Sequence, residues 1–218
     1  MFPEMFSKLL DGFTLEPIAL DPEFQIMKTS GMTFTISAAR IPGVAHVSVM
    51  QAKGFFGLMK MDSFIVVPFG KDMPLMSYDR IHAMGNDKLY LEFYQTTLSR
   101  PSLAKISALK KTAAGISDAN PGESWYKSLL DEASTYKAGR KKDSPAIDRL
   151  STEMMKTYFS LLRLAGPCDE TAKTARNSEY VEGLLTNGGP STNAFIKAHG
   201  KEKTARLFRE YLFGTGRS

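Results

Sequence analysis

The sequence predicts an α+β fold, a three-layer α/β/α sandwich with a central antiparallel sheet over residues 31–97 and helices mainly from the C-terminal half of the chain. Two observations predict it. Apolar and polar residues alternate with a period of two in the first half, as in half-buried strands. In the second half apolar residues recur every three to four positions, as in helices. Strands that precede helices in this way favour α+β over a wound βαβ sheet.

The first thirty residues predict one helix and an irregular segment. Residues Met1–Asp11 carry apolar side chains at helical spacing, and Gly12 follows as a stop signal. The next segment, residues 13–30, contains Pro17 and Pro22 and has no clear period. We therefore expect it to lead into the sheet without regular structure of its own.

Five strands are predicted between residues 31 and 97, and the first four are followed by turns that contain glycine. They cover residues 32–40, 45–52, 58–68, 74–81 and 88–97. Closely spaced turns indicate a meander whose neighbouring strands pair antiparallel. The third strand is apolar nearly throughout, which indicates that helices cover both faces of the sheet.

Six helical segments are predicted after Ser99. They cover residues 101–114, 123–136, 145–165, 169–185, 191–199 and 201–213. The segment 145–165 has the longest helical pattern. Residues 115–122 and the charged stretch 138–143 are predicted as loops.

Length, net charge and composition limit the kind of protein that this sequence can encode. A chain of 218 residues is long enough for one domain with a sizeable core, and we expect residues 1–218 to form it. The net charge of +5 favours an acidic partner or an anionic ligand, and is too small to indicate nucleic acid. The sequence shows no apolar run of about 20 residues and no signal-peptide pattern. With the single cysteine, this predicts a cytoplasmic protein, or a plastid stromal one, that has no membrane span and is a monomer or weak dimer.

Several standard chemistries are excluded by the motifs. There is no glycine-rich nucleotide loop, no HExxH pattern and no cysteine pair. His46, His82 and His199 are scattered along the chain, so we expect no metal site. Cys168 follows Gly-Pro at a predicted helix end and is interpreted as a plain thiol.

Asp79 is the most informative residue because it lies within an apolar predicted strand. A carboxyl group in that setting loses hydration, which raises its pKa. It can then hold a proton near neutral pH and donate it as a general acid. Alternatively, Asp79 pairs with Arg80 or caps a nearby turn, and position alone favours that structural role.

Four sequence features occur in a recognisable order across about 170 residues. The first is Gln51-Ala52-Lys53 at a strand end. The second is the apolar strand 64–67 closing on Pro68, followed by Asp72-x-Pro74. The third is Asp79, five residues after that proline and before a glycine turn. The fourth is the C-terminal stretch 200–213, with Tyr180 upstream of it. In these features the chain resembles the ferredoxin-dependent bilin reductases and red chlorophyll catabolite reductase, and is interpreted as a divergent member.

That resemblance implies a function. It implies a linear tetrapyrrole (bilin) such as biliverdin bound between the sheet and the C-terminal helices. It also implies reduction without a bound metal or organic cofactor. Reduced ferredoxin or flavodoxin would supply single electrons as the acidic protein donor, and side chains would supply protons.

The resemblance also assigns roles to residues. Asp79 matches the central proton-donating aspartate. Asp62 or Ser63 falls where some members keep a second relay residue, commonly histidine, and Glu179 where several carry a helix-borne Asp or Asn. Gln51 or Met50 falls where members that convert biliverdin to phycocyanobilin keep a glutamate. The absence of that glutamate puts this particular regiochemistry in doubt. We therefore expect Asp79, Asp62 and Glu179 to be catalytic.

Binding residues are predicted by charge and by the same resemblance. Gln51, Ser63 and Tyr180 are expected to contact the substrate. Arg40, Lys53, Arg163 and Arg176 are candidate partners for its propionates, although each is as well explained as a solvated surface charge. Seven cations are candidates for a docking face for the electron donor. They are Lys105, Lys110, Lys111, Lys197, Lys201, Lys203 and Arg206.

Two alternatives to a reductase stay open. The protein could hold a tetrapyrrole or another flat apolar ligand without reducing it, because histidine is absent from the relay position. It could also be a divergent member with a filled pocket and a role in protein interaction. Which bilin and which double bond would be reduced is not determined by the sequence.

Overall fold

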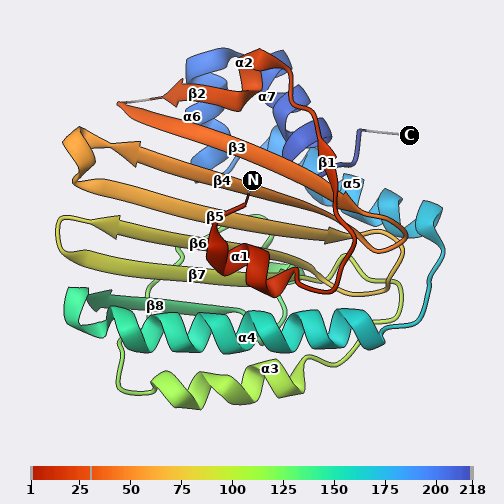
Figure 1. Ribbon diagram of the computed structural model, residues 1–218, viewed down its shortest axis with the longest axis horizontal. Coiled ribbons are helices and arrows are strands. Elements are labelled where there is room, and N and C mark those ends of the chain that lie inside the picture. The colour runs from red at the N-terminus through yellow and green to blue at the C-terminus, as the bar shows by residue number, and fades with distance from the viewer. Residues whose placement is uncertain (1, 30, 217–218) are drawn as a thin grey trace.

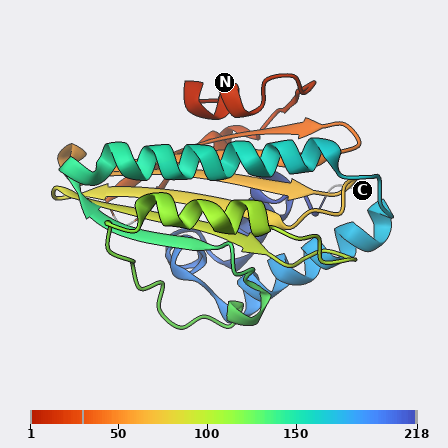
Figure 2. The same ribbon diagram turned by 90° about the horizontal axis from the view of Figure 1, so that it is seen from below.

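An antiparallel sheet lies between two layers of helices (Figure 1). The computed structural model describes residues 2–29 and 31–216. Over this range the sheet has eight strands in the order β1-β3-β4-β5-β6-β7-β8, with β2 also paired to β3. Figure 2 shows α4 on one side of the sheet and α5 on the other. The predicted α+β sandwich is therefore confirmed.

The first half of the chain contains most of the sheet. Its elements are α1 (Glu4–Leu9), β1 (Glu16–Ile18), α2 (Pro22–Gln25), β2 (Ile26–Thr29), β3 (Met32–Ile41), β4 (Ala45–Gly54), η1 (Phe55–Gly57), β5 (Met59–Pro68), β6 (Leu75–Ala83) and β7 (Asn86–Tyr94). The five predicted strands correspond to β3–β7. The prediction of an irregular segment over 13–30 was wrong, because β1, α2 and β2 lie there. These elements are only three or four residues long, too short to show a period. Met1 and Ser30, which end two predicted segments, lie outside the described residues.

The second half contributes one strand and most of the helices. Its elements are α3 (Ala104–Ala108), η2 (Leu109–Ala113), η3 (Lys127–Leu129), β8 (Thr135–Arg140), η4 (Lys141–Asp143), α4 (Ser144–Leu164), α5 (Glu170–Asn187), α6 (Pro190–His199), α7 (Lys201–Arg206) and the π-helical η5 (Leu207–Leu212). Most predicted helices have counterparts here.

The predicted helix over 123–136 was wrong. Only a single 3₁₀ turn, η3, forms within it, and its last two residues begin β8. Trp125 and Leu129 are spaced as on a helix, but they lie in a turn and in η3, and Trp125 packs on Gly183 of α5. β8 also takes up half of the predicted loop 138–143. Its pairing with β7 is a long-range contact that a local period does not reveal.

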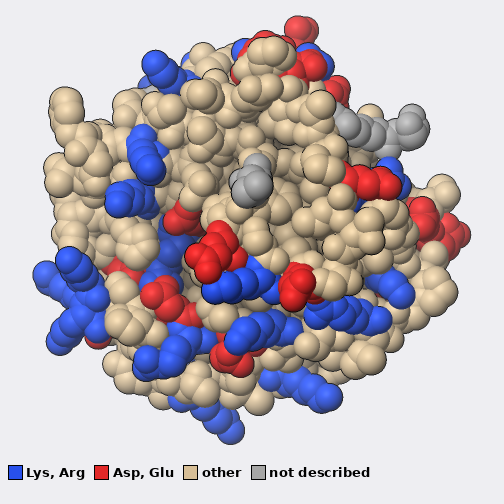
Figure 3. All heavy atoms as spheres, in the orientation of Figure 1, with Lys and Arg blue, Asp and Glu red and all other residues tan. Residues whose placement is uncertain are grey.

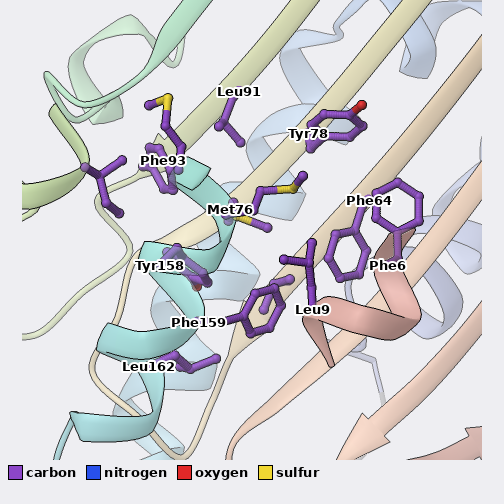
Figure 4. Packing of buried hydrophobic residues seen from close by; sticks show 14 of the residues in the cluster. Phe6, Leu9, Phe64, Met76, Tyr78, Leu91, Phe93, Tyr158, Phe159 and Leu162 are labelled. Atoms are coloured by element: carbon purple, nitrogen blue, oxygen red, sulfur yellow. The ribbon is translucent and has the colours of Figure 1, made fainter. Parts of the chain in front are cut away.

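One face of the sheet packs against α1 and α4 (Figure 4). Phe6 of α1 stacks on Phe64 of β5 with ring centroids 4.6 Å apart, and Phe159 of α4 stacks on the same ring. Tyr158 of α4 is fully buried, and its hydroxyl donates a hydrogen bond of 2.7 Å to the Pro74 carbonyl. We call this side the α4 face.

The opposite side, the α5 face, packs against α2, α5, α6 and η5. Phe34 of β3 contacts Phe195 of α6, and Phe24 of α2 contacts Tyr211 of η5. Residues of β5 alternate between the faces: Phe64 belongs to the α4-face core and Ile65 to the α5-face core. A strand covered on both sides explains the continuous apolar run of β5.

A fully buried ion pair fastens β6 to β7 on the α4 face. Arg80 donates to Asp87 through Nε and through Nη2, the latter at 2.6 Å. Ser144, at the start of α4, also donates to Asp87. Burial alone would raise the pKa of Asp87, but these hydrogen bonds and the Arg80 charge hold it below its ordinary value. The pair therefore ties the sheet to the first turn of α4.

Both lateral edges of the sheet are covered. β1 and β2 pair with successive parts of the outer side of β3. On the other edge, the loop before β8 bonds to it, with Ala138 donating to the Ser117 carbonyl and Ala119 donating to the Tyr136 carbonyl. Among the described residues, no helix is long and apolar enough to cross a membrane.

Candidate active site

A cavity of about 280 Å³ lies on the α5 face, between the sheet and the C-terminal helices. Its lining combines two carboxyl groups with tyrosines and apolar side chains. The carboxyl groups are Asp79 and Glu92, and the tyrosines are Tyr90, Tyr94, Tyr126 and Tyr180. The apolar lining includes Met50, Met61, Ile65, Phe208 and Phe213. No Lys or Arg is among the described lining residues.

Strand register brings the polar groups together. Residues paired directly across antiparallel strands project from the same face of the sheet. Ser63 of β5 pairs with Asp79 of β6, which pairs with Tyr90 of β7, which pairs with Tyr136 of β8. One row of side chains therefore crosses four strands and forms the cavity floor and its outer border.

Asp79 is a half-buried carboxyl group on the cavity floor. Ser63 donates a hydrogen bond to its Oδ1, and Ser77 donates a longer one of 3.4 Å to Oδ2. Burial raises the pKa of Asp79, and the two serine hydrogen bonds partly oppose that rise. A carboxyl group in this state can retain a proton at a pH where a solvated aspartate has lost it.

Glu92 is a second cavity carboxyl group that the sequence reasoning missed. It is 8% exposed and pairs with Ser77 in the row next to Asp79. Tyr94 donates to its Oε2 at 2.6 Å, and Tyr136 donates to its Oε1 at 3.0 Å. Burial raises its pKa and the charge of Asp79 adds to the rise, whereas the two hydroxyls oppose it. The alternation Tyr90-x-Glu92-x-Tyr94 was the available signal.

Aromatic rings form one wall of the cavity. Tyr180 of α5 is buried, and its ring centroid lies 4.4 Å from that of Tyr94. Trp125 lies 6.0 Å from Tyr180, and its Nε1 donates to the Gly188 carbonyl at 3.1 Å. The indole rests on Gly183, where a Cβ would come within 2.2 Å of it. Tyr94 and Tyr180 therefore give the cavity an aromatic wall, with their ring planes tilted by 39°, and Trp125 packs against Tyr180.

The structure places Asp62 and Gln51 on the other face of the sheet. Asp62 precedes Ser63 in β5, so its side chain points away from the cavity. It pairs with Gln51 of β4, whose Nε2 donates to it at 2.7 Å. Lys53 projects from the same face as Gln51 and is exposed. The cavity thus contains Ser63 and Tyr180 but not Asp62, Gln51 or Lys53.

Glu179 and Arg40 also lie away from the cavity. Glu179 is 68% exposed and pairs with Arg176 at 3.4 Å on the solvent side of α5. Arg40 lies over the ring of Phe69, at 4.4 Å from its centroid, and borders a different hollow. Neither group is brought to Asp79.

Lys88 is the cation that the strand register places beside the cavity. It pairs with Ile81, which lines the cavity, so both side chains project from the α5 face. Lys88 is exposed and lies two residues from Tyr90 on β7. It can reach an anionic group that extends from the cavity into solvent.

The seven candidate docking cations do not form one surface. Lys105, Lys110 and Lys111 belong to α3 and η2, whereas the other four belong to α6 and α7 at the far side of the sheet (Figure 1). Figure 3 shows Lys and Arg gathered over the lower part of the molecule, where Figure 1 places α3 and α4. Of the other set, Lys203 pairs with Glu23 at 2.8 Å and Arg206 with Asp21.

Among the described residues, Cys168 and the side chains that could ligate a metal do not gather at one place. Burial raises the pKa of the Cys168 thiol, whose Sγ lies 3.6 Å from the Phe69 carbonyl oxygen. Within residues 2–29 and 31–216, no three His, Cys, Asp or Glu side chains gather so as to hold a metal ion.

The fold and cavity define a class of protein, an α/β/α sandwich whose antiparallel sheet carries an acidic, tyrosine-rich cavity beneath its C-terminal helices. Phytochromobilin synthase from tomato, solved in complex with biliverdin, has a similar fold, with a TM-score of 0.76 over 97% of this chain and 80% of that one. The two sequences are 10% identical, so the likeness shows the fold. No protein-family model and no curated protein sequence matches the chain. The resemblance to bilin reductases is thus confirmed for the fold.

Proposed function

We propose that this protein reduces a linear tetrapyrrole, taking electrons singly from reduced ferredoxin or flavodoxin and protons from its own side chains. The observation that carries the proposal is Asp79, a carboxyl group with a raised pKa on the floor of an aromatic cavity. A neighbour of the same fold binds biliverdin. No resident cofactor is required by this chemistry.

The cavity suits part of a flat conjugated ligand. Its volume of about 280 Å³ is close to the lower end of small-molecule pockets, so a bilin would extend partly into solvent. Tyr180 and Tyr94 would contact its plane, and methionines would adapt to its edge. Its propionates would lie outside, where Lys88 is available.

Asp79 is proposed as the first proton donor. One electron from the protein donor converts the bilin into a radical that is more basic than the oxidised pigment. Asp79 then transfers its proton to the radical, and its carboxylate is stabilised by Ser63 and Ser77. A second electron and a second proton complete the addition of two hydrogen atoms to the conjugated system. The apolar walls exclude water from the part of the radical that lies inside the cavity.

The electron donor is proposed to be an acidic protein. Lys105 and Lys111 are exposed on α3 and η2, within the basic region seen in Figure 3. Attraction between this region and an acidic donor would raise the association rate and would weaken with salt. A reduction rate that does not change with ionic strength would argue against docking here.

The test is optical. Purified protein is mixed with stoichiometric biliverdin, and reduced ferredoxin is then added without oxygen. A long-wavelength band that shifts on binding and then bleaches or moves on reduction supports the proposal, and the product spectrum identifies the bond reduced. A bilin spectrum identical to that of free pigment would refute both binding and reduction.

The alternative function is that of a protein that binds a bilin or another flat apolar ligand without reducing it. It is favoured by the absence of Lys and Arg from the described lining and by the absence of histidine at Ser63 and Asp62. A binding shift that persists unchanged after reduced ferredoxin is added would favour this alternative.

A further inference from the structure

Reduction of one double bond consumes two protons, and the cavity holds two carboxyl groups. Asp79 accounts for one proton. Asp62 and Glu179, expected as further donors, point away from the cavity. Glu92 is the other carboxyl group in the lining, and burial isolates it from bulk water. A residue in that position needs a route by which a lost proton is replaced.

Tyr136 provides contact between Glu92 and the outside of the molecule. It lies on β8, next to β7, and its hydroxyl is 3.0 Å from Glu92 Oε1. The register with Tyr90 places the Tyr136 ring on the α5 face, and the side chain is only partly buried. The tyrosine therefore stands between a buried carboxyl group and solvent.

We propose that Glu92 delivers the second proton to the substrate and is recharged from solvent through the hydroxyl of Tyr136. This inference rests on the proposed function and extends it to a residue and a route. Glu92 is the catalytic residue in this step, and Tyr136 acts through it.

The proton balance has three steps. Glu92 transfers its carboxyl proton to the bilin after the second electron has arrived from the protein donor, which forms a C–H or N–H bond. The resulting carboxylate accepts hydrogen bonds from Tyr94 and Tyr136, as in the structure. Tyr136 then passes its hydroxyl proton to Oε1 while its oxygen takes a proton from solvent water. Tyr136 is neutral before and after.

The surroundings of Glu92 favour Tyr136 over Tyr94 as the route. Asp79 on β6 and the tyrosines Tyr90, Tyr94, Tyr126 and Tyr180 all line the same cavity as Glu92. Tyr94 is 2% exposed and packs against Tyr126 and Tyr180, so its hydroxyl leads back into the cavity. Burial and the Glu92 charge raise the pKa of Tyr136, so it transfers a proton without persisting as a tyrosinate.

Tyr136→Phe tests the route because it removes only the hydroxyl. A protein that begins with Glu92 protonated should complete its first turnover at the wild-type rate. Later turnovers, which need recharging, should slow by about tenfold or more, and their solvent isotope effect should rise. The biliverdin band shift on binding should not change. Glu92→Gln should slow the first turnover as well.

Tyr78→Phe is the matched control. Tyr78 precedes Asp79 in β6 and is buried on the α4 face, where its ring packs against Phe6. It should keep wild-type rates in every turnover. Tyr136→Phe with wild-type rates in later turnovers would overturn the inference, and so would equal slowing of its first and later turnovers. A wild-type protein that never reduces the bilin would instead overturn the proposed function.

Discussion

Asp79 and Arg80 are consecutive in β6, yet their side chains lie on opposite faces of the sheet. Arg80 is buried on the α4 face with Asp87, whereas Asp79 lines the cavity on the α5 face. The alternative that Asp79 serves as the ion-pair partner of Arg80 is therefore excluded. Asp79 instead interacts with two serine hydroxyls, which leave its proton available for transfer.

Asp79→Asn should abolish reduction while leaving binding intact. The amide has nearly the same shape but carries no transferable carboxyl proton. We expect the reduction rate to fall by about 10²- to 10⁴-fold, with an unchanged biliverdin band shift on binding. Stopped-flow absorbance with reduced ferredoxin measures both. A variant that binds and reduces at the wild-type rate would remove Asp79 from the mechanism.

Ser63→Ala should move the pH dependence of reduction upward. An acid catalyst works only while protonated, so the rate falls as pH rises through the Asp79 pKa. Ser63 donates to the carboxylate form, and its loss raises that pKa further. The alkaline limb of the rate profile should therefore shift to higher pH. Ser77→Ala, which removes the longer 3.4 Å contact, should shift it less. A downward shift would contradict this account.

Lys88→Met should weaken binding of a bilin only when its propionates are charged. The substitution keeps most of the side-chain length and removes the ammonium group beside the cavity. We expect affinity for biliverdin to fall by about tenfold, the equivalent of one charge-assisted hydrogen bond. Affinity for biliverdin dimethyl ester, which lacks the carboxylates, should stay the same. Equal losses for both pigments would indicate a packing effect.

Asp87→Asn should lower the free energy of unfolding by about 3–5 kcal/mol, because it leaves the Arg80 charge buried without its partner. Denaturant unfolding measures the loss. Asp148→Asn is the control, since Asp148 contacts Arg80 at 3.3 Å but is 61% exposed, and should cost at most about 1 kcal/mol.

The ion pair between Arg80 and Asp87 also predicts that the free energy of unfolding depends on pH. The pKa of Asp87 is lowered in the folded protein, so its contribution is present above the ordinary aspartate pKa and is lost as pH falls through the folded value. The stability gap between wild type and Asp87→Asn should therefore narrow in acid. A gap that stays constant would show that the carboxylate charge is not its origin.

The sheet was predictable where turns and alternation are local. Strands β3 to β7 are joined by short turns with glycine, and each has a visible pattern. β8 was missed because it is defined by its register with β7, in which Tyr90 pairs with Tyr136 across more than forty residues of chain. The spacing of Trp125, Leu129 and Leu130 imitated a helix instead. Local periods cannot report such a pairing.

The sequence singled out Asp79 at the centre of the candidate site, but it did not identify most of the residues around it. Asp79 stands out because a carboxyl group in an apolar strand is unusual. The second position on β5 was uncertain by one residue, and in a strand that uncertainty reverses the face. Ser63 lies on the floor with Asp79, and Asp62 lies on the other side. Glu92 could be connected to Asp79 only once the register of β6 and β7 was known.

The covered edges of the sheet bear on how the protein behaves at high concentration. A long strand with open backbone groups at an edge is a template for joining another copy. Here β3 is shielded by β1 and β2, and β8 by the loop that contains Ser117 and Ala119. Edge-to-edge polymerisation would first require one of these short segments to detach. Residues 13–29 show little regular pattern in the sequence. Removing them should nevertheless cause the protein to aggregate, because it would expose the edge of β3.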